Sequence, residues 1–210
     1  MIAFFNWFTK ITGWPFEKLI LRTKIYYENK AIQGRKIKGP AVVISNHTSV
    51  FDYAVMLFVF FGRTLRVQMA EVLFKKKVLG GFLKMMGGIY VNREVKNFTF
   101  MTKSEEILQK GGVVGIFPEG RLPLKDEERP LEFKPGASYL ALALNVPIIP
   151  IYTNGKYFTK ERTRVIVGTP IMPSDVENGE GSDKEKLEAL NNICRERIIE
   201  LGKILDEKQK

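Results

Sequence analysis

The sequence predicts an α/β domain in which helices flank a largely parallel central sheet. From residue 41 onward, short β-rich apolar runs alternate with longer stretches of helical periodicity, an order typical of parallel sheets. The chain has 210 residues, and 45% of them are hydrophobic, which is enough for one substantial core. We therefore expect a single α/β domain at residues 31–210, preceded by a separate N-terminal segment.

The N-terminal segment, residues 1–30, predicts two short amphipathic helices. Aromatic residues share one helical face before a break around Gly13-Trp14-Pro15, and residues 16–27 follow with apolar side chains among lysines and arginines. Such a helix pair suits the interface of a bilayer, and it also fits a hairpin folded onto its own domain. The residues alone leave both readings open. The candidate membrane-binding side chains are Phe4, Phe5, Trp7, Phe8 and Trp14.

Strands and helices then alternate along the chain. Each predicted strand is rich in β-branched or aromatic residues, and each predicted helix repeats its apolar positions every three or four residues. Cys194, the only cysteine, lies in such a helical register, so we expect a core thiol and a reducing compartment. The predicted strands are 41–45, 65–69, 88–92, 112–117, 147–152 and 163–168. The predicted helices are 50–61, 71–86, 97–110, 135–145 and 182–206.

The composition is basic, with 33 lysines and arginines against 23 aspartates and glutamates and a net charge of +10. Such a surface attracts nucleic acid, anionic lipid or phosphorylated small molecules. The basic residues are not concentrated on one predicted helix, and the aromatic residues gather at the N-terminus rather than alternating with charge on strands. Nucleic acid is therefore not an expected partner.

His47, the only histidine, follows the predicted strand 41–45 and lies five residues before Asp52. A histidine at the end of a buried strand can act as a base near neutral pH. The two side chains can meet if His47 lies in the turn and Asp52 lies in the first helical turn. The pattern from Ser49 to Asp52 also fits a capping box, in which Asp52 caps backbone amides. The two roles are compatible.

A histidine–aspartate pair deprotonates a hydroxyl or thiol, and in hydrolases that group belongs to the protein. The nearest match to a nucleophile elbow, residues 136–140, lacks the second glycine and falls inside a predicted helix. A substrate hydroxyl is then the group to be activated, which favours acyl transfer to an alcohol with His47 as general base. One histidine and one distant cysteine form no ligand cluster, so no metal is expected.

Basic or turn-forming residues also stand at the ends of other predicted elements. Ligands of an open parallel sheet bind where the carboxyl ends of its strands meet. Arginine forks and helix N-termini suit a phosphomonoester, although each of these residues alone fits an ordinary surface position. The candidate anion-binding residues are Arg93 after strand 88–92, Glu119, Gly120 and Arg121 after strand 112–117, and Lys134 before helix 135–145.

Four segments resemble, in order and approximate spacing, the four motifs of the glycerolipid acyltransferases. They are residues 46–52, which carry His-x4-Asp, and residues 88–93, 117–120 and 146–150. The chain is most similar to the bacterial 1-acyl-sn-glycerol-3-phosphate acyltransferases, over roughly residues 40–152. The resemblance implies that His47 and Asp52 activate the acceptor hydroxyl. It also implies that Arg93, Glu119 and Gly120 bind the glycerol phosphate. Arg121 stands where the family commonly has threonine, so its role is less secure.

The resemblance also implies a reaction and a location. A fatty acyl group would pass from acyl-coenzyme A or acyl-acyl-carrier-protein to the sn-2 hydroxyl of lysophosphatidic acid, making phosphatidic acid in phospholipid biosynthesis without a bound cofactor. Because such a substrate lies in a bilayer surface, we expect a peripheral protein at the cytoplasmic face of the cell membrane, attracted by anionic lipid. An acyl-chain pocket is expected beside Val55, Phe58 and Val59.

Two alternatives stay open at this point. The acceptor could instead be glycerol 3-phosphate or another lysolipid, which would keep the chemistry and change the substrate. The chain could also be a basic module without enzymatic activity that binds membrane or nucleic acid.

Overall fold

Within residues 1–92, 98–177 and 181–208, which the computed structural model describes, seven strands form one sheet. The strands are β1 (Lys24–Tyr27), β2 (Ala41–Ser45), β3 (Leu65–Ala70), β4 (Ile89–Val91), β5 (Val113–Ile116), β6 (Ile148–Thr153) and β7 (Arg164–Val167). Their order in the sheet is β1-β7-β6-β2-β5-β3-β4. Only the β6–β7 pair is antiparallel among these strands, so the expected largely parallel sheet is confirmed.

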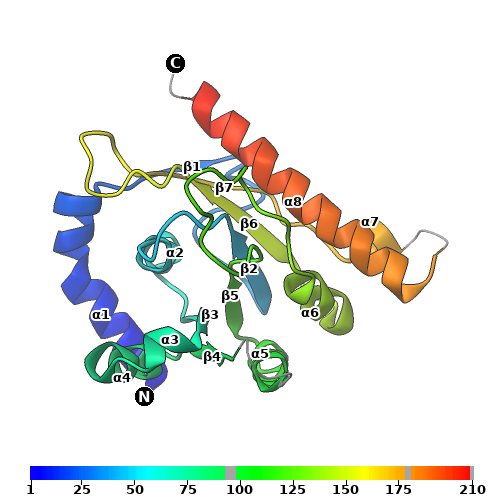
Figure 1. The fold of residues 1–210 in the computed structure, drawn as a ribbon, viewed down its shortest axis with the longest axis horizontal. Helices are drawn as coiled ribbons and strands as arrows, with labels where there is room; N and C mark the ends of the chain where they lie inside the picture. The colour runs from blue at the N-terminus through cyan, green and yellow to red at the C-terminus, as the bar shows by residue number, and fades with distance from the viewer. Residues whose placement is uncertain (93–97, 178–180, 209–210) are drawn as a thin grey trace.

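Helices cover both faces of the sheet (Figure 1). They are α1 (Ile2–Phe16), η1 (Glu17–Leu21), α2 (Asp52–Val59), α3 (Glu71–Phe74), α4 (Lys77–Met85), α5 (Thr99–Gln109), α6 (Gly136–Leu144), α7 (Ser174–Glu177) and α8 (Asp183–Glu207). Helices α2 and α4 pack on one face through residues such as Met56 and Leu83. Helices α5, α6 and α8 pack on the other face through Leu108, Leu140 and Ile198. The result is a three-layer α/β arrangement with a core on each side of the sheet.

The carboxyl ends of the three central strands lie side by side. In the parallel registers, Ile44 of β2 pairs with Ile116 of β5, and Ser45 of β2 pairs with Ile151 of β6. Residues 41–45 are all buried, because both faces of β2 are covered by core side chains. The loops that leave β2, β5 and β6 therefore start at the same edge, where ligands of such sheets bind.

The predicted helix at 71–86 is in fact two helices. Lys76 adopts an extended conformation, with ψ of 113°, between the end of α3 and the start of α4. This break lets α4 approach α3 so closely that a β-carbon on Gly80 would lie 2.3 Å from the carbonyl oxygen of Phe74. The packing of Leu83 in the core overrides the continuous helical pattern of the sequence.

The N-terminal segment also differs from the expected pair of helices. Helix α1 continues through Pro15 to Phe16, and the chain then forms the π-helical stretch η1. Proline has no backbone N–H to donate, and the wider π-helical turn follows directly after the last residue of α1. Arg22, in the left-handed conformation with φ of 51°, ends it. Residues 24–27 are not helical: they form β1, an unexpected edge strand that pairs with β7. The short helix α7 was also unexpected.

Helix α1 buries polar side chains and exposes apolar ones. Asn6 and Lys10 are each only 1% exposed. The Lys10 ammonium donates hydrogen bonds to the carbonyl oxygens of Phe60, Phe61 and Arg63, at 3.1, 3.2 and 2.6 Å, just beyond the end of α2. Burial, and secondarily the charge of Arg35, lower the pKa of Lys10 to about 8, so it stays largely protonated at neutral pH. The exposed apolar side chains of α1 include Phe4, Trp7, Phe8, Ile11 and Trp14.

Phe5 faces inward, unlike the other aromatic residues expected at the membrane. It is half-buried and meets Phe82 of α4 edge to face, with ring centroids 5.9 Å apart. Phe5 therefore attaches α1 to the domain. Within the described parts of the chain, no helix combines the length and the apolar character that crossing a bilayer requires.

Candidate active site

His47 lies in the turn that leaves β2, and it contacts Asp52 at the start of α2. The Nδ1 atom of His47 is 2.9 Å from Oδ2 of Asp52, so the two side chains meet as the sequence predicts. Asp52 is buried, and the His47 ring stacks on Phe117, with centroids 4.3 Å apart and planes 18° from parallel. Because Nδ1 faces the carboxylate, Nε2 is the nitrogen left for a substrate.

The Asp52 carboxylate accepts hydrogen bonds from four further donors. The backbone N–H groups of Thr48 and Ser49 donate to Oδ2 at 2.6 and 2.8 Å. The Thr48 hydroxyl donates to Oδ1 at 2.9 Å, and the Tyr157 hydroxyl donates to the same oxygen. Only one half of the expected capping box is present: Asp52 accepts from the Ser49 N–H, whereas α2 begins at Asp52 with Phe51 as its N-cap and no side-chain cap. Asp52 instead holds the turn before the helix and orients the imidazole.

Tyr157 is a site residue that the sequence did not indicate. It lies 105 positions from Asp52, in the loop after β6. Thr153, at the end of β6, contacts the Tyr157 hydroxyl at 3.2 Å and exchanges two hydrogen bonds of 2.9 Å with Asn46. Only its position in the chain could have indicated Tyr157. The fourth motif leads into β6, and β6 pairs with β2, so the loop after β6 reaches the same edge of the sheet as His47.

Glu119 holds the backbone of the turn that carries His47. Its carboxylate oxygens accept hydrogen bonds from the N–H groups of His47, at 2.7 Å, and Leu131, at 2.9 Å. Burial raises the pKa of Glu119, although these two hydrogen bonds and His47 oppose the rise. Both oxygens are therefore engaged within the chain. In this structure Glu119 supports the turn that carries His47, and it is not among the residues that line the adjacent pocket.

A pocket of about 1240 Å³ opens beside His47. Its walls are largely apolar, and no serine or cysteine is among the described residues that line it. The apolar wall differs from the expected one: Val55 and Val59 are buried in the core, and Phe58 lies against Gly13 of α1. The apolar lining residues instead include Tyr53, Leu73, Leu79, Phe82, Phe100 and Met101.

The pocket also has a side suited to anions. Lys134 and Gly120 both line it, and the Lys134 side chain lies over Gly120. Gly136, the first residue of α6, lines it too, and no side chain in the described ranges caps this helix. The free N–H groups of a helix N-terminus favour phosphate and other anions.

Arg121, one of the two candidate arginines, is not among the residues that line this pocket. The Arg121 guanidinium pairs with Glu127 through two hydrogen bonds, one of them 2.6 Å from Nη1 to Oε2. This pairing lowers the pKa of Glu127 to about 2 and directs Arg121 into the exposed 122–131 loop. Arg93 lies outside the described residues.

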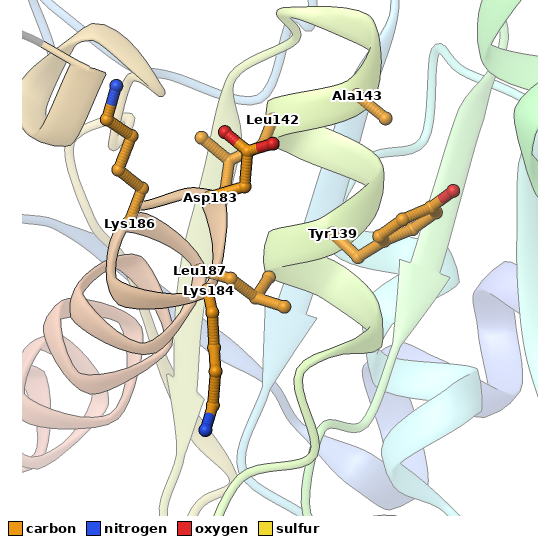
Figure 2. Close-up of a pocket in the computed structure, with 7 residues that line it drawn as sticks. All are labelled: Tyr139, Leu142, Ala143, Asp183, Lys184, Lys186 and Leu187. Carbon is orange, nitrogen blue, oxygen red and sulfur yellow. The ribbon is translucent and has the colours of Figure 1, made fainter. Parts of the chain in front are cut away.

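A second hollow, of about 680 Å³, lies between α6 and α8. Tyr139 and Leu187 line both hollows, so the two adjoin. Figure 2 shows Leu187 pointing toward α6, whereas Lys184 and Lys186 point in opposite directions. The charged groups of this hollow therefore do not converge on one ligand. Among the described residues, no cluster of three or more histidine, cysteine, aspartate or glutamate side chains could hold a metal ion.

The family model named Acyltransferase matches residues 23–154, which include His47, Asp52 and Lys134. This chain belongs to the acyltransferase family. The resemblance stated above is thereby confirmed, and so is the expectation of an enzyme. The matched segment also contains every residue of the central strands β2, β5 and β6, so the family shares the elements that place the site.

Two named relatives match more than half of this chain. A 1-acyl-sn-glycerol-3-phosphate acyltransferase of Bacillus subtilis (strain 168) is 30% identical over 140 residues, which cover 64% of this chain and 67% of that protein. The human 1-acyl-sn-glycerol-3-phosphate acyltransferase beta is 31% identical over 141 residues, which cover 61% of this chain and 49% of that protein. The chain thus matches between about half and two thirds of the length of these relatives.

A solved structure supports the acyltransferase fold. The 1-acyl-sn-glycerophosphate acyltransferase PlsC of Thermotoga maritima superimposes with a TM-score of 0.66. The alignment covers 96% of this chain and 79% of that chain, at 20% sequence identity. At this identity the likeness establishes the shared fold.

Proposed function

We propose that this acyltransferase transfers a fatty acyl group from an acyl thioester to the sn-2 hydroxyl of 1-acyl-sn-glycerol 3-phosphate, making phosphatidic acid. The thioester is acyl-coenzyme A or acyl-acyl-carrier-protein, a co-substrate rather than a bound cofactor. The names of the relatives support this acceptor. The observation that carries the proposal is the 2.9 Å contact of His47 with Asp52 at a pocket whose described walls offer no serine or cysteine nucleophile.

His47 is the general base in this reaction. Asp52 fixes the tautomer with the proton on Nδ1, so Nε2 takes the proton of the acceptor hydroxyl. The hydroxyl oxygen attacks the carbonyl carbon of the thioester. When the carbon–sulfur bond breaks, the proton on Nε2 passes to the departing thiolate. Asp52 stabilises the imidazolium between these two steps.

The shape and charge of the pocket fit a lysophospholipid. The apolar walls accept an acyl chain, and each methylene removed from water contributes about 0.8 kcal/mol. We place the phosphate beside Lys134, Gly120 and the N-terminus of α6, where a cation and backbone amides meet. Arg93 stays a predicted second phosphate ligand.

We infer peripheral attachment to the cytoplasmic face of an anionic membrane, and the exposed outer face of α1 supports the attachment itself. Trp7 and Phe8 of α1 are 57% and 50% exposed, and Val78 of the adjoining α4 is 89% exposed. Lys76 and Lys77 are exposed next to Val78. Apolar side chains beside lysines suit the boundary between headgroups and acyl chains. Because Leu79 and Phe82 of α4 also line the pocket, a lipid would have a short path from the bilayer to His47.

The test combines an acceptor panel with one variant. The wild-type protein should make phosphatidic acid from lysophosphatidic acid and either thioester, and it should use glycerol 3-phosphate or lysophosphatidylcholine poorly. His47→Ala should lower kcat by about a hundredfold to ten-thousandfold, because general-base catalysis is lost. The purified variant should keep its circular dichroism spectrum.

Two results would count against the proposal. A wild-type protein that acylates another acceptor in preference would refute the substrate. A folded His47→Ala variant with nearly full turnover would refute the base.

A further inference from the structure

Among the described residues, Tyr157 is the one side chain hydrogen-bonded to Asp52 that lies beyond the matched segment, residues 23–154. We propose that Tyr157 is a positioning residue for acyl transfer, because its hydroxyl holds Oδ1 of Asp52 so that Oδ2 faces His47. The same hydrogen bond reduces the negative charge that the Asp52 carboxylate presents to the imidazole. The proposal rests on the proposed function, because it concerns the same base. It assigns a role to a residue outside the four motifs.

The two oxygens of Asp52 have different partners. Oδ2 accepts from the backbone N–H groups of Thr48 and Ser49 and faces Nδ1 of His47. Oδ1 accepts from two hydroxyl groups, those of Thr48 and Tyr157. Rotation of the carboxylate would exchange these partners. Donors on both oxygens therefore hold one orientation, which is what a catalytic base needs from its partner.

The loop after β6 is built to bring Tyr157 to this point. Its backbone N–H bonds the carbonyl oxygen of Gly155 at 3.0 Å, which folds the loop tightly. Gly155 has φ of +65°, and a β-carbon there would lie 2.6 Å from Oγ1 of Thr48. Only glycine thus allows the loop to pack against the turn that contains Thr48. The side chain of Tyr157 is 9% exposed, so water competes little for the hydroxyl.

The hydroxyl can act toward Asp52 only as a donor. Burial, followed by the charge of Asp52, raises the pKa of Tyr157 well above its ordinary value, so the phenol keeps its proton. A carboxylate that accepts fewer hydrogen bonds keeps more of its negative charge, so it stabilises a neighbouring imidazolium more strongly. Removal of the phenol hydroxyl should therefore make the protonated imidazole persist to higher pH. The other charged groups around His47 are unchanged by this removal: Glu119 at its backbone, and Lys134 and Glu105 in the lining of the same pocket.

The chain is suited to a direct test, because His47 is its only histidine and gives the only imidazole signals in an NMR titration. The variant is Tyr157→Phe. The matched control is Tyr152→Phe, because Tyr152 lies on β6 and packs against the opposite core with Leu201 and Leu205. We expect the titration midpoint of the imidazole to move to higher pH in Tyr157→Phe and to stay at the wild-type value in Tyr152→Phe.

The kinetic expectation runs in the same direction. In Tyr157→Phe, kcat should fall by about tenfold to a hundredfold, because the base is less well oriented. The acid limb of the pH–rate profile should shift to higher pH, since more imidazole is protonated at a given pH. The KM for lysophosphatidic acid should stay within about twofold, because Tyr157 does not line the pocket.

An unmoved titration midpoint in Tyr157→Phe would overturn the proposal, even if kcat fell, because a packing defect alone would then explain the loss. If that variant does not fold, Thr48→Val removes the other hydroxyl donor on Oδ1 and should shift the midpoint in the same direction. No shift there would equally overturn it. The NMR titration needs no turnover. A shifted midpoint in a protein that makes no phosphatidic acid would therefore refute the proposed reaction while supporting the role of Tyr157.

Discussion

Helices α1 and α8 both lie at the surface of the molecule (Figure 1). Their buried residues show that they orient their side chains in opposite ways. Helix α8 begins with a capping box between Ser182 and Glu185, and it turns an apolar stripe toward the sheet. Helix α1 turns Asn6 and Lys10 toward the domain and aromatic side chains outward. The buried residues of α8 are Leu190, Cys194, Ile198, Leu201, Gly202 and Leu205.

The difference shows that periodicity locates an apolar face without saying what covers it. Helix α8 follows the rule for a helix between a core and water, so its partner is the sheet of the same chain. In α1 the cost of burying Lys10 is offset by three carbonyl acceptors, and the aromatic face is left without cover within the described residues. That face is open to a partner outside the chain, and the partner proposed above is a bilayer.

The largest effect on the free energy of unfolding should come from a substitution in α8, whose apolar stripe faces the sheet. Ile198 of α8 is completely buried between the helix and the sheet. Ile198→Ala should lower the free energy of unfolding by about 2–5 kcal/mol, because it removes buried methyl groups and leaves a cavity. Asn192→Ala, on the exposed side of the same helix, should change it by less than about 0.5 kcal/mol. Urea unfolding measures both. Equal effects would mean that α8 does not rely on its apolar stripe.

The fold could be predicted where each element carries its own signal. Strand β2 was predicted at its observed bounds, because residues 41–45 are uniformly apolar or small and end at a polar turn. Helix α8 was predicted within a residue of each end, since its periodicity is long. Strand β1 could not be predicted in this way. Residues 24–27 also fit a helix, and they become a strand because the edge of β7 is available for pairing.

An intermediate effect should come from Lys10, the polar anchor of α1. Lys10→Met keeps most of the side-chain volume but removes the donor from three carbonyl oxygens. We expect a loss of about 1–3 kcal/mol in the free energy of unfolding, the cost of leaving buried polar groups unsatisfied. Lys203→Met, an exposed position on α8, is the matched control. If both variants unfold at the same urea concentration, the inward polar face of α1 contributes nothing to stability.

The candidate site was predictable to the extent that its residues are close in sequence. His47 and Asp52 are five positions apart, and a strand followed by a helix start brings them together. Tyr157 and the two backbone bonds of Glu119 depend on which strands are neighbours, and a linear pattern does not contain that information. Arg121 was expected at the anion-binding side of the site, but it pairs with Glu127, which follows it by six residues.

The smallest effect on the free energy of unfolding should come from the exposed aromatic residues of α1. Here α1 should differ most from α8, whose apolar residues are buried. Trp7→Ser combined with Phe8→Ser should change the free energy of unfolding by less than about 1 kcal/mol, because both side chains are mostly exposed. The same change should weaken binding to anionic vesicles by at least about tenfold, since each aromatic side chain buried in lipid contributes roughly 1.5–3 kcal/mol. Sedimentation with phosphatidylglycerol vesicles measures this. Leu124→Ser, an exposed apolar residue in the 122–131 loop, should bind like the wild type. If the double variant also sediments like the wild type, the aromatic face of α1 does not hold the protein on the membrane, and its exposure needs another partner.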